Sequence, residues 1–139
     1  MNETELTLLM AAKLLWAHKF SWKGRATRTE FWLSEIILGF IGGLMYLYAS
    51  LVMFMGFQFY DETLFLGVTS LLLITICGII TIGLIILTIT SCIRRLHDIG
   101  KSGWYVWVGL IPIVGQVLLI IWISRPSDGD NRYGSIPVY

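Results

Sequence analysis

Long uninterrupted apolar runs dominate the pattern of hydrophobic and polar positions along the chain. Three of them, residues 33–57, 64–93 and 104–123, are each long enough to cross the roughly 30 Å hydrocarbon core of a bilayer, which takes about 20 helical residues. Because lipid offers the backbone no hydrogen-bond partner, such a run crosses a membrane as a helix. The pattern therefore predicts an all-α membrane protein with three transmembrane helices, in one domain of residues 1–139.

The segment before the first run, residues 5–22, has a different pattern. Apolar side chains recur on one broad face, and Lys13 near the middle makes a membrane crossing costly. The aromatic side chains of Trp16, Phe20 and Trp22 suit the headgroup level of a membrane. We therefore expect an amphipathic helix that lies in the membrane interface, with packing against another protein as the alternative.

The composition supports a membrane protein. Apolar residues make up 56% of the chain and charged residues 14%, against roughly 45–50% and about 25% in soluble domains, and the mean hydropathy is +0.76. The net charge of +1 gives no reason to expect nucleic acid as a partner. Cys77 and Cys92 lie too far apart on one helix for a disulfide and are interpreted as packing residues.

The few charges are placed asymmetrically and orient the chain. Basic residues precede the first run and separate the second from the third, whereas the segment between the first two runs carries Asp61 and Glu62 and no Lys or Arg. Positively charged segments stay in the cytoplasm. The pattern thus predicts a cytoplasmic N-terminus, a cytoplasmic loop over residues 94–101 and an external acidic loop.

The third run decides on which side the tail, residues 124–139, lies. Pro112 and Gly115 stand near the middle of the run. Proline is tolerated in packed membrane helices, so we expect residues 104–123 to cross and the tail to be external. Alternatively, the two residues form a re-entrant turn, which would return the tail to the cytoplasmic side.

Four sequence blocks follow one another along the chain. They are FSWKGRATRTEFW (residues 20–32), RRLHDIGKSGWY (94–105), IPIVG (111–115) and DGDNRYGSIP (128–137). Together they resemble the bacterial inner-membrane family called domain of unknown function 805, the YhaH-like proteins. The chain departs from the family pattern at Tyr105, where a second Trp is usual, and at Asp130, where relatives often have Glu. The resemblance covers nearly the whole chain and implies a small inner-membrane protein, without an established activity, cofactor or catalytic residue.

The first two blocks place basic side chains beside aromatic ones at the predicted cytoplasmic interface. Basic residues near an anionic leaflet contribute about 1 kcal/mol each, and arginine can hold a phosphate through two hydrogen bonds. The expected cluster, which would bind anionic lipid or a partner protein, contains Arg25, Arg28, Arg94, Arg95, His97, Asp98, Lys101 and Trp104. Alternatively, the arginines only orient the chain and pair with Glu30, Glu35 and Asp98.

Other patterns with chemical meaning are incomplete. GKS at residues 100–102 lacks the leading glycine and the preceding strand of a phosphate loop. Metal sites use three or four ligands, and His97 has only Asp98 beside it, so no metal or cofactor is expected. The spacing in DGDN (128–131) is typical of a calcium loop without its closing carboxylate, and it is interpreted as a turn.

Two further sets of residues have expected roles. Asn131, Tyr133 and Gly134 form the tail motif of the family resemblance. Gly39 and Gly43 form a pair of small residues four positions apart, which lets a helix of this chain or of a second copy approach closely.

The residues together predict a non-enzymatic integral membrane protein that organises anionic lipid or a partner protein through the basic cluster. An oligomeric channel or transporter component is the alternative, because Ser and Thr recur along residues 64–93. A membrane enzyme that acts on lipid phosphate comes third. The expected partners are lipids, a membrane protein or further copies of the chain.

Overall fold

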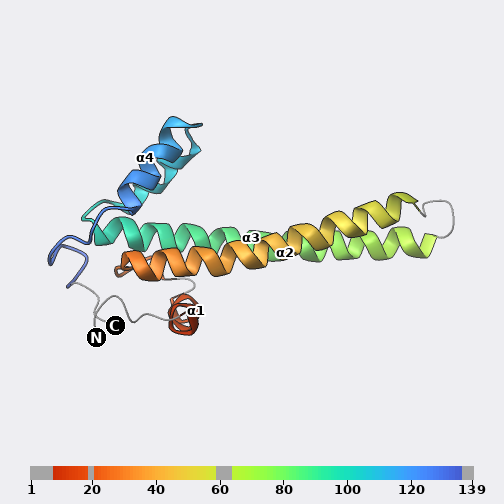
Figure 1. Cartoon of the computed structure of the whole chain (residues 1–139), viewed down its shortest axis with the longest axis horizontal. Helices are drawn as coiled ribbons and strands as arrows, with labels where there is room; N and C mark the ends of the chain where they lie inside the picture. The colour runs from red at the N-terminus through yellow and green to blue at the C-terminus, as the bar shows by residue number, and fades with distance from the viewer. Residues whose placement is uncertain (1–7, 19–20, 59–63, 136–139) are drawn as a thin grey trace. The chain divides into compact units, whose positions relative to one another are not determined.

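The computed structural model describes residues 8–18, 21–58 and 64–135, and all regular secondary structure among them is helical. The prediction of an all-α protein is confirmed. Helices follow in the order α1 (Leu8–Ala17), α2 (Arg28–Gln58), α3 (Leu64–Asp98), the 3-10 helix η2 (Gly103–Leu110) and α4 (Val114–Ile123), as drawn in Figure 1.

The chain divides into two compact units. The first, here called the cluster unit, comprises residues 1–37 and 86–139. It contains α1, the first turns of α2, the last turns of α3 and the segments that follow α3. The second, here called the two-helix unit, comprises residues 38–85, which are the remaining parts of α2 and α3.

Helices α2 and α3 are long and apolar enough to cross a membrane, over Arg28–Gly56 and Gly67–Asp98. Only 6% of the most apolar window of each helix is buried within the protein. Large side chains such as Phe40 and Ile79 are 69% and 65% exposed. Contiguous apolar surface of this extent is typical of contact with lipid rather than water. Two of the three predicted spans are therefore helices of spanning length.

The third predicted span, residues 104–123, is not one helix. The chain forms η2, bends at Pro112, where no N–H is available to continue a helix, and resumes as α4 after Ile113, whose φ is 61°. Eight residues of 3-10 helix reach about 16 Å and ten of α-helix about 15 Å, roughly half of the hydrocarbon core. Three spanning helices are thus not confirmed, and the alternative of a turn at Pro112 and Gly115 is observed.

The hairpin of η2 and α4 is closed by a glycine. A Cβ atom on Gly115 would lie 1.9 Å from the carbonyl oxygen of Val108 and 2.8 Å from Cβ of Ile111. Only a residue without a side chain permits this approach. Farther along, the rings of Tyr105 and Trp122 meet edge to face with centroids 5.3 Å apart. The two short helices therefore form one packed element.

A small apolar core fastens the hairpin to the rest of the cluster unit. Phe31 of α2, Cys92 of α3 and Ile123 of α4 are buried together, and Val106 and Leu119 pack against them. Both cysteines of the chain are buried and free, in agreement with the interpretation of packing residues.

Helix α1 is shorter than the helix predicted over residues 5–22. Residues 5–7 and 19–20, and with them Phe20, lie outside the described residues, and residues 18, 21 and 22 are not helical. Within α1, Ala11 and Leu15 are buried one turn apart, while Trp16 is 70% exposed. The helix therefore has one buried edge, and the predicted amphipathic helix in a membrane interface stays a prediction.

In the two-helix unit, α2 and α3 meet at Gly42 rather than at the predicted pair. A Cβ atom on Gly42 would lie 3.9 Å from Cδ1 of Leu84. Nothing beyond the helix's own backbone lies within 4 Å of a Cβ atom on Gly39 or Gly43, as far as the described residues extend. Contact of this pair with a second copy of the chain stays a prediction.

Candidate functional site

The site forms where the segment before α2 meets the end of α3. The N–H of Ala26 donates to the carbonyl oxygen of Arg94 at 3.2 Å, which holds the two segments together. Helix α2 then begins with an N-cap arrangement, because the hydroxyl of Thr27 accepts a hydrogen bond from the N–H of Glu30 at 3.2 Å. The start of α2 is thus fixed against the last turn of α3.

The end of α3 is fixed by a glycine cap. Gly100 has a φ of +70° and its N–H donates to the carbonyl of His97, while the N–H of Lys101 donates to the carbonyl of Leu96. This pair of bonds is the Schellman motif, which glycine adopts without strain. A Cβ atom on Gly100 would also lie 3.1 Å from Oδ2 of Asp128, so glycine leaves room for the tail.

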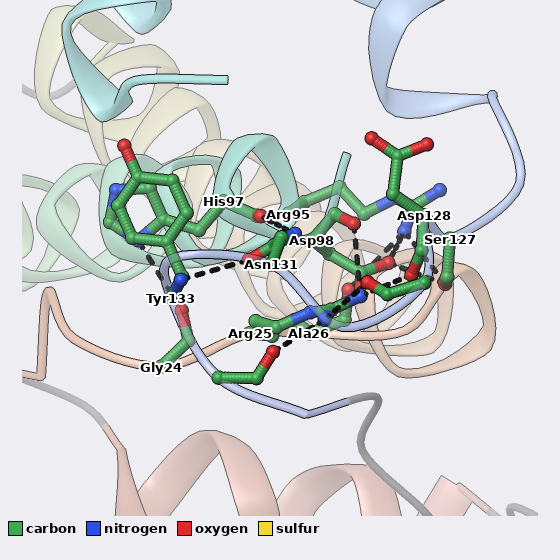
Figure 2. Close-up of polar contacts among 12 residues, drawn as sticks. Gly24, Arg25, Ala26, Arg95, His97, Asp98, Ser127, Asp128, Asn131 and Tyr133 are labelled. Carbon is green, nitrogen blue, oxygen red and sulfur yellow. Dashed lines mark hydrogen bonds and ion pairs between the residues drawn. The ribbon is translucent and has the colours of Figure 1, made fainter. Parts of the chain in front are cut away.

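Asp98 lies at the centre of the site and is completely buried. Its Oδ1 accepts from Nε of Arg25 at 2.9 Å, and its Oδ2 accepts from Nη1 of Arg95 and from the hydroxyl of Ser127 (Figure 2). Its backbone carbonyl accepts from Nη2 of Arg25 and from the N–H of Asp128, both at 3.1 Å. Such pairing is what keeps a carboxylate charged away from water.

Arg25 uses every N–H of its guanidinium group. Besides its two bonds to Asp98, it donates from Nη2 to the carbonyl of Asp128 at 2.6 Å and from Nη1 to the carbonyls of Gly129 and Gly134 at 3.0 and 2.8 Å. These bonds, with those to Asp98, account for all five donors of an arginine. One side chain from the N-terminal segment therefore joins α3 to the tail.

This contact bears on the predicted position of the tail. The expectation of three spans placed residues 124–139 on the opposite side of the membrane from Arg25. In the structure, hydrogen bonds join Arg25 to the carbonyls of Asp128, Gly129 and Gly134, so the tail lies beside the N-terminal segment. The external tail is therefore not confirmed, and the third run turns at Pro112. Residues 136–139 lie outside the described residues.

Arg95 binds the end of the hairpin to α3. Its Nε donates to the carbonyl of Ile123 at 2.8 Å, and its Nη2 donates to the carbonyl of Arg125. Nη1 faces Asp98 and the carbonyl of Ala26. A cation at these carbonyls is favourable, because the last carbonyl groups of a helix have no partner within it and carry partial negative charge.

A second buried ion pair lies beside the first. Nη1 of Arg94 donates to Oε1 of Glu30 at 2.7 Å, and both side chains are almost completely inaccessible to solvent. Glu35, which was expected among the pairing acids, instead accepts from the hydroxyl of Thr88 at 3.4 Å. The alternative that the arginines pair with Glu30 and Asp98 is thus confirmed, and the pairing of Glu35 with an arginine is not.

Arg25, Arg94 and Arg95, with Glu30 and Asp98, are called the buried charge cluster below. The arginines are 6%, 2% and 0% exposed. In this structure their guanidinium groups face protein acceptors, and lipid headgroups would meet other residues. The cluster packs the N-terminal segment, α2, α3 and the tail into one body of the cluster unit.

The remaining predicted site residues lie around this cluster. Arg28 is exposed at the start of α2, and Trp104 is 79% exposed at the start of η2. Nζ of Lys101 lies 4.9 Å from the ring centre of Tyr105 and 4.5 Å from that of Trp122, within the range of cation–π attraction. Lys101 therefore contacts the hairpin rather than Asp98.

The tail motif joins the site through His97. The side-chain amide of Asn131 donates to the carbonyl of His97 at 3.0 Å, and the ring of Tyr133 stacks on the imidazole with centroids 3.9 Å apart (Figure 2). Asn131 and Gly134 exchange backbone hydrogen bonds, which close a tight turn. Nδ1 of His97 also lies 3.3 Å from the carbonyl oxygen of Gly24. The predicted tail residues and the predicted basic cluster form one site.

Sequence reasoning missed several members of the site. Ser127 carries no motif, and the carbonyl groups of residues 123–134 that accept from arginines have no signature in side-chain chemistry. The spacing of Arg95 and Asp98, three residues apart near a helix end, was a usable signal, because such residues are neighbours on a helix surface. In the part of the chain that the structure describes, no three His, Cys, Asp or Glu side chains are placed to hold a metal ion.

Comparison with known proteins assigns the chain to a family. A family profile described as "Protein of unknown function (DUF805)" matches residues 19–135, a range that contains the whole buried charge cluster. The chain belongs to the DUF805 family. The resemblance inferred from the four sequence blocks is confirmed.

Two relatives of this DUF805 protein come from Escherichia coli (strain K12). The chain is 28% identical to inner membrane protein YhaI over 118 residues, 84% of this chain and 85% of YhaI. It is 32% identical to inner membrane protein YhaH over 120 residues, 83% of this chain and 85% of YhaH. No solved structure matches the chain. These names state a location and no activity, so a function for this DUF805 protein is argued from its own residues.

Proposed function

We propose that this DUF805 protein is a non-enzymatic inner-membrane protein that organises anionic lipid at its cytoplasmic face. The observation that carries the proposal is that some basic side chains of the unit are buried and others are exposed. Three are buried with two carboxylates, while Lys23, Arg28, Arg125 and Arg132 are exposed on the same unit. Each exposed basic residue near an anionic leaflet is worth about 1 kcal/mol, so the surface set favours anionic headgroups.

The buried charge cluster fixes the backbone segments that carry these exposed residues. Lys23 and Arg28 flank Arg25, and Arg125 is one residue beyond the C-cap of α4, where Arg95 is anchored. A preorganised surface binds with less loss of conformational entropy than a flexible basic segment does. The buried arginines thus position the lipid-binding residues without touching lipid themselves.

The lipid proposal is tested by co-purification in mild detergent followed by native mass spectrometry. We expect the wild-type protein to retain phosphatidylglycerol over phosphatidylethanolamine. In the triple variant Lys23→Gln/Arg28→Gln/Arg125→Gln, the ratio of retained phosphatidylglycerol to phosphatidylethanolamine should fall at least tenfold. Three basic residues are removed, and each contributes about 1 kcal/mol near an anionic leaflet.

The matched control exchanges the same residues without changing their charge, as Lys23→Arg/Arg28→Lys/Arg125→Lys. It should keep the wild-type preference for phosphatidylglycerol. Equal retention of the two lipids by the wild-type protein would contradict the proposed function.

A second copy of the chain is the second candidate partner. It is favoured by Gly39 and Gly43, against which no other described part of the chain packs. Close approach of two helices at small residues is the common mode of association in membranes. Gly39→Leu/Gly43→Leu should then convert a dimer to a monomer in native mass spectrometry, whereas a wild-type monomer would remove this candidate.

A further inference from the structure

A groove of about 640 Å³ lies in the cluster unit along the last three turns of α3. Ile86, Ile89, Ile93 and His97 line it at intervals of three or four residues, so they share one face of the helix. Trp107 of η2 also lines it. The volume is within the range of small-molecule binding sites, about 300–1,000 Å³.

The groove changes from apolar to polar along its length. Ile86 and Ile89 lie toward the middle of α3, and His97 lies in its final turn. The eleven residue steps from Ile86 to His97 span about 16 Å of helix. That distance equals about half of the roughly 30 Å hydrocarbon core, which is the depth of a single leaflet.

The polar end carries groups suited to an anionic headgroup. Ser102, Tyr133 and His97 line it, and the guanidinium carbon of Arg132 lies 4.8 Å from the ring centre of Tyr133. Trp22 also lines the groove and is 64% exposed. Tryptophan is enriched at the headgroup level of membranes. The polar end therefore combines an interfacial aromatic, hydrogen-bonding side chains and a nearby cation.

We infer that this groove binds one molecule of an anionic glycerophospholipid. An acyl chain lies along Ile86, Ile89 and Ile93, and the phosphate lies near Ser102 and Arg132. A partner helix would not need a polar end at the depth of one leaflet, and a free phosphate would not need the apolar part. This inference rests on the proposed function and names a specific site for the lipid within it.

The test separates the acyl and headgroup parts of the groove. Ile89→Trp fills the apolar part without changing charge, and Ile82→Trp places the same side chain at an exposed position of α3 that does not line the groove. Native mass spectrometry with added phosphatidylglycerol should show one tightly held lipid in the wild-type protein and in Ile82→Trp. Occupancy in Ile89→Trp should fall at least tenfold.

The headgroup part is tested by Arg132→Gln, a surface substitution that leaves the groove open. This variant should still hold one lipid and lose its preference for phosphatidylglycerol over phosphatidylethanolamine. Circular dichroism checks that each variant keeps its helices, and Arg132→Gln carries the test if Ile89→Trp does not fold.

The outcomes distinguish the groove from the wider proposal. Unchanged occupancy in Ile89→Trp, or unchanged lipid preference in Arg132→Gln, would overturn the groove as the site. If the wild-type protein still preferred phosphatidylglycerol in that case, the proposed function would stand and only the location would fail. A wild-type protein without that preference would contradict both the groove as the lipid site and the proposed function.

Discussion

Asp98 is surrounded by the donors of two arginines and a serine, and no part of it reaches solvent. A buried ion pair contributes little net stability relative to apolar residues of the same volume. Removal of one partner, however, leaves an uncompensated charge and costs roughly 3–5 kcal/mol. The stability of the cluster unit is therefore most sensitive at Asp98, which Arg25 and Arg95 share.

Asp98→Asn is expected to lower the free energy of unfolding by about 3–5 kcal/mol, because both guanidinium groups lose their carboxylate while staying buried. Thermal unfolding in detergent, followed by circular dichroism, measures the change. Lys23→Gln, which removes a charge at an exposed position, should change it by less than about 0.5 kcal/mol. Similar values for the two variants would contradict the central role of Asp98.

Arg25→Lys keeps the positive charge and removes the planar group that reaches three tail carbonyls. Lysine has three donors on one atom and cannot reproduce the five-bond arrangement of arginine. We expect residues 125–134 to become sensitive to protease and to exchange amide hydrogens faster, while the helices persist.

Arg28→Lys is the matched control for Arg25→Lys, because Arg28 is the neighbouring exposed arginine. Its tail should be as protected as that of the wild-type protein. Equal protection of the tail in both variants would show that Arg25 is not what holds it.

At the scale of elements, the hairpin of η2 and α4 depends on Gly115. Gly115→Ala places a methyl group against the backbone carbonyl of Val108, which cannot move away as a flexible side chain would. We expect the free energy of unfolding to fall by about 1–3 kcal/mol, the range found for overpacked sites. Gly129→Ala has open space around its Cβ atom and should be nearly neutral in the same thermal unfolding measurement.

Hydropathy predicts the elements well where one physical effect dominates. Residues 33–57 and 64–93 were expected as spans, and α2 and α3 cover them as Arg28–Gln58 and Leu64–Asp98. Both helices extend beyond the apolar runs, and the charged residues Glu30, Arg94, Arg95 and Asp98 in these extensions are paired within the protein. For residues 104–123, hydropathy measures only the free energy of transfer into lipid. It does not report the interruption of the helix at Pro112.

The site was predictable as a set of residue types and not as a geometry. Arg25, Arg94, Arg95 and Asp98 were selected from the sequence, and the structure brings them together. Their main acceptors in the tail are backbone carbonyls, which every residue carries and no motif distinguishes. Whether arginines bind lipid or protein depends on burial, which charge patterning does not report.

At the scale of the whole molecule, we predict that the tail lies on the same side of the membrane as the N-terminal segment, the predicted cytoplasmic side, because Arg25 binds its carbonyls and two helices have spanning length. Ser135→Cys should therefore react with a membrane-impermeant maleimide only after cells are lysed. Glu62→Cys, in the predicted external loop, should react in intact cells or spheroplasts. Labelling of Ser135→Cys before lysis would restore the three-span topology.

The acceptors of Arg25 have a consequence for how the chain is made. They lie 73 to 109 residues farther along the sequence, the last being the carbonyl of Gly134. The ribosome therefore adds Arg25 109 residues before its last acceptor, and the full set of bonds cannot form until Gly134 has been added. Because Gly134 follows α2 and α3 in the sequence, the site can close only after both helices have been synthesised.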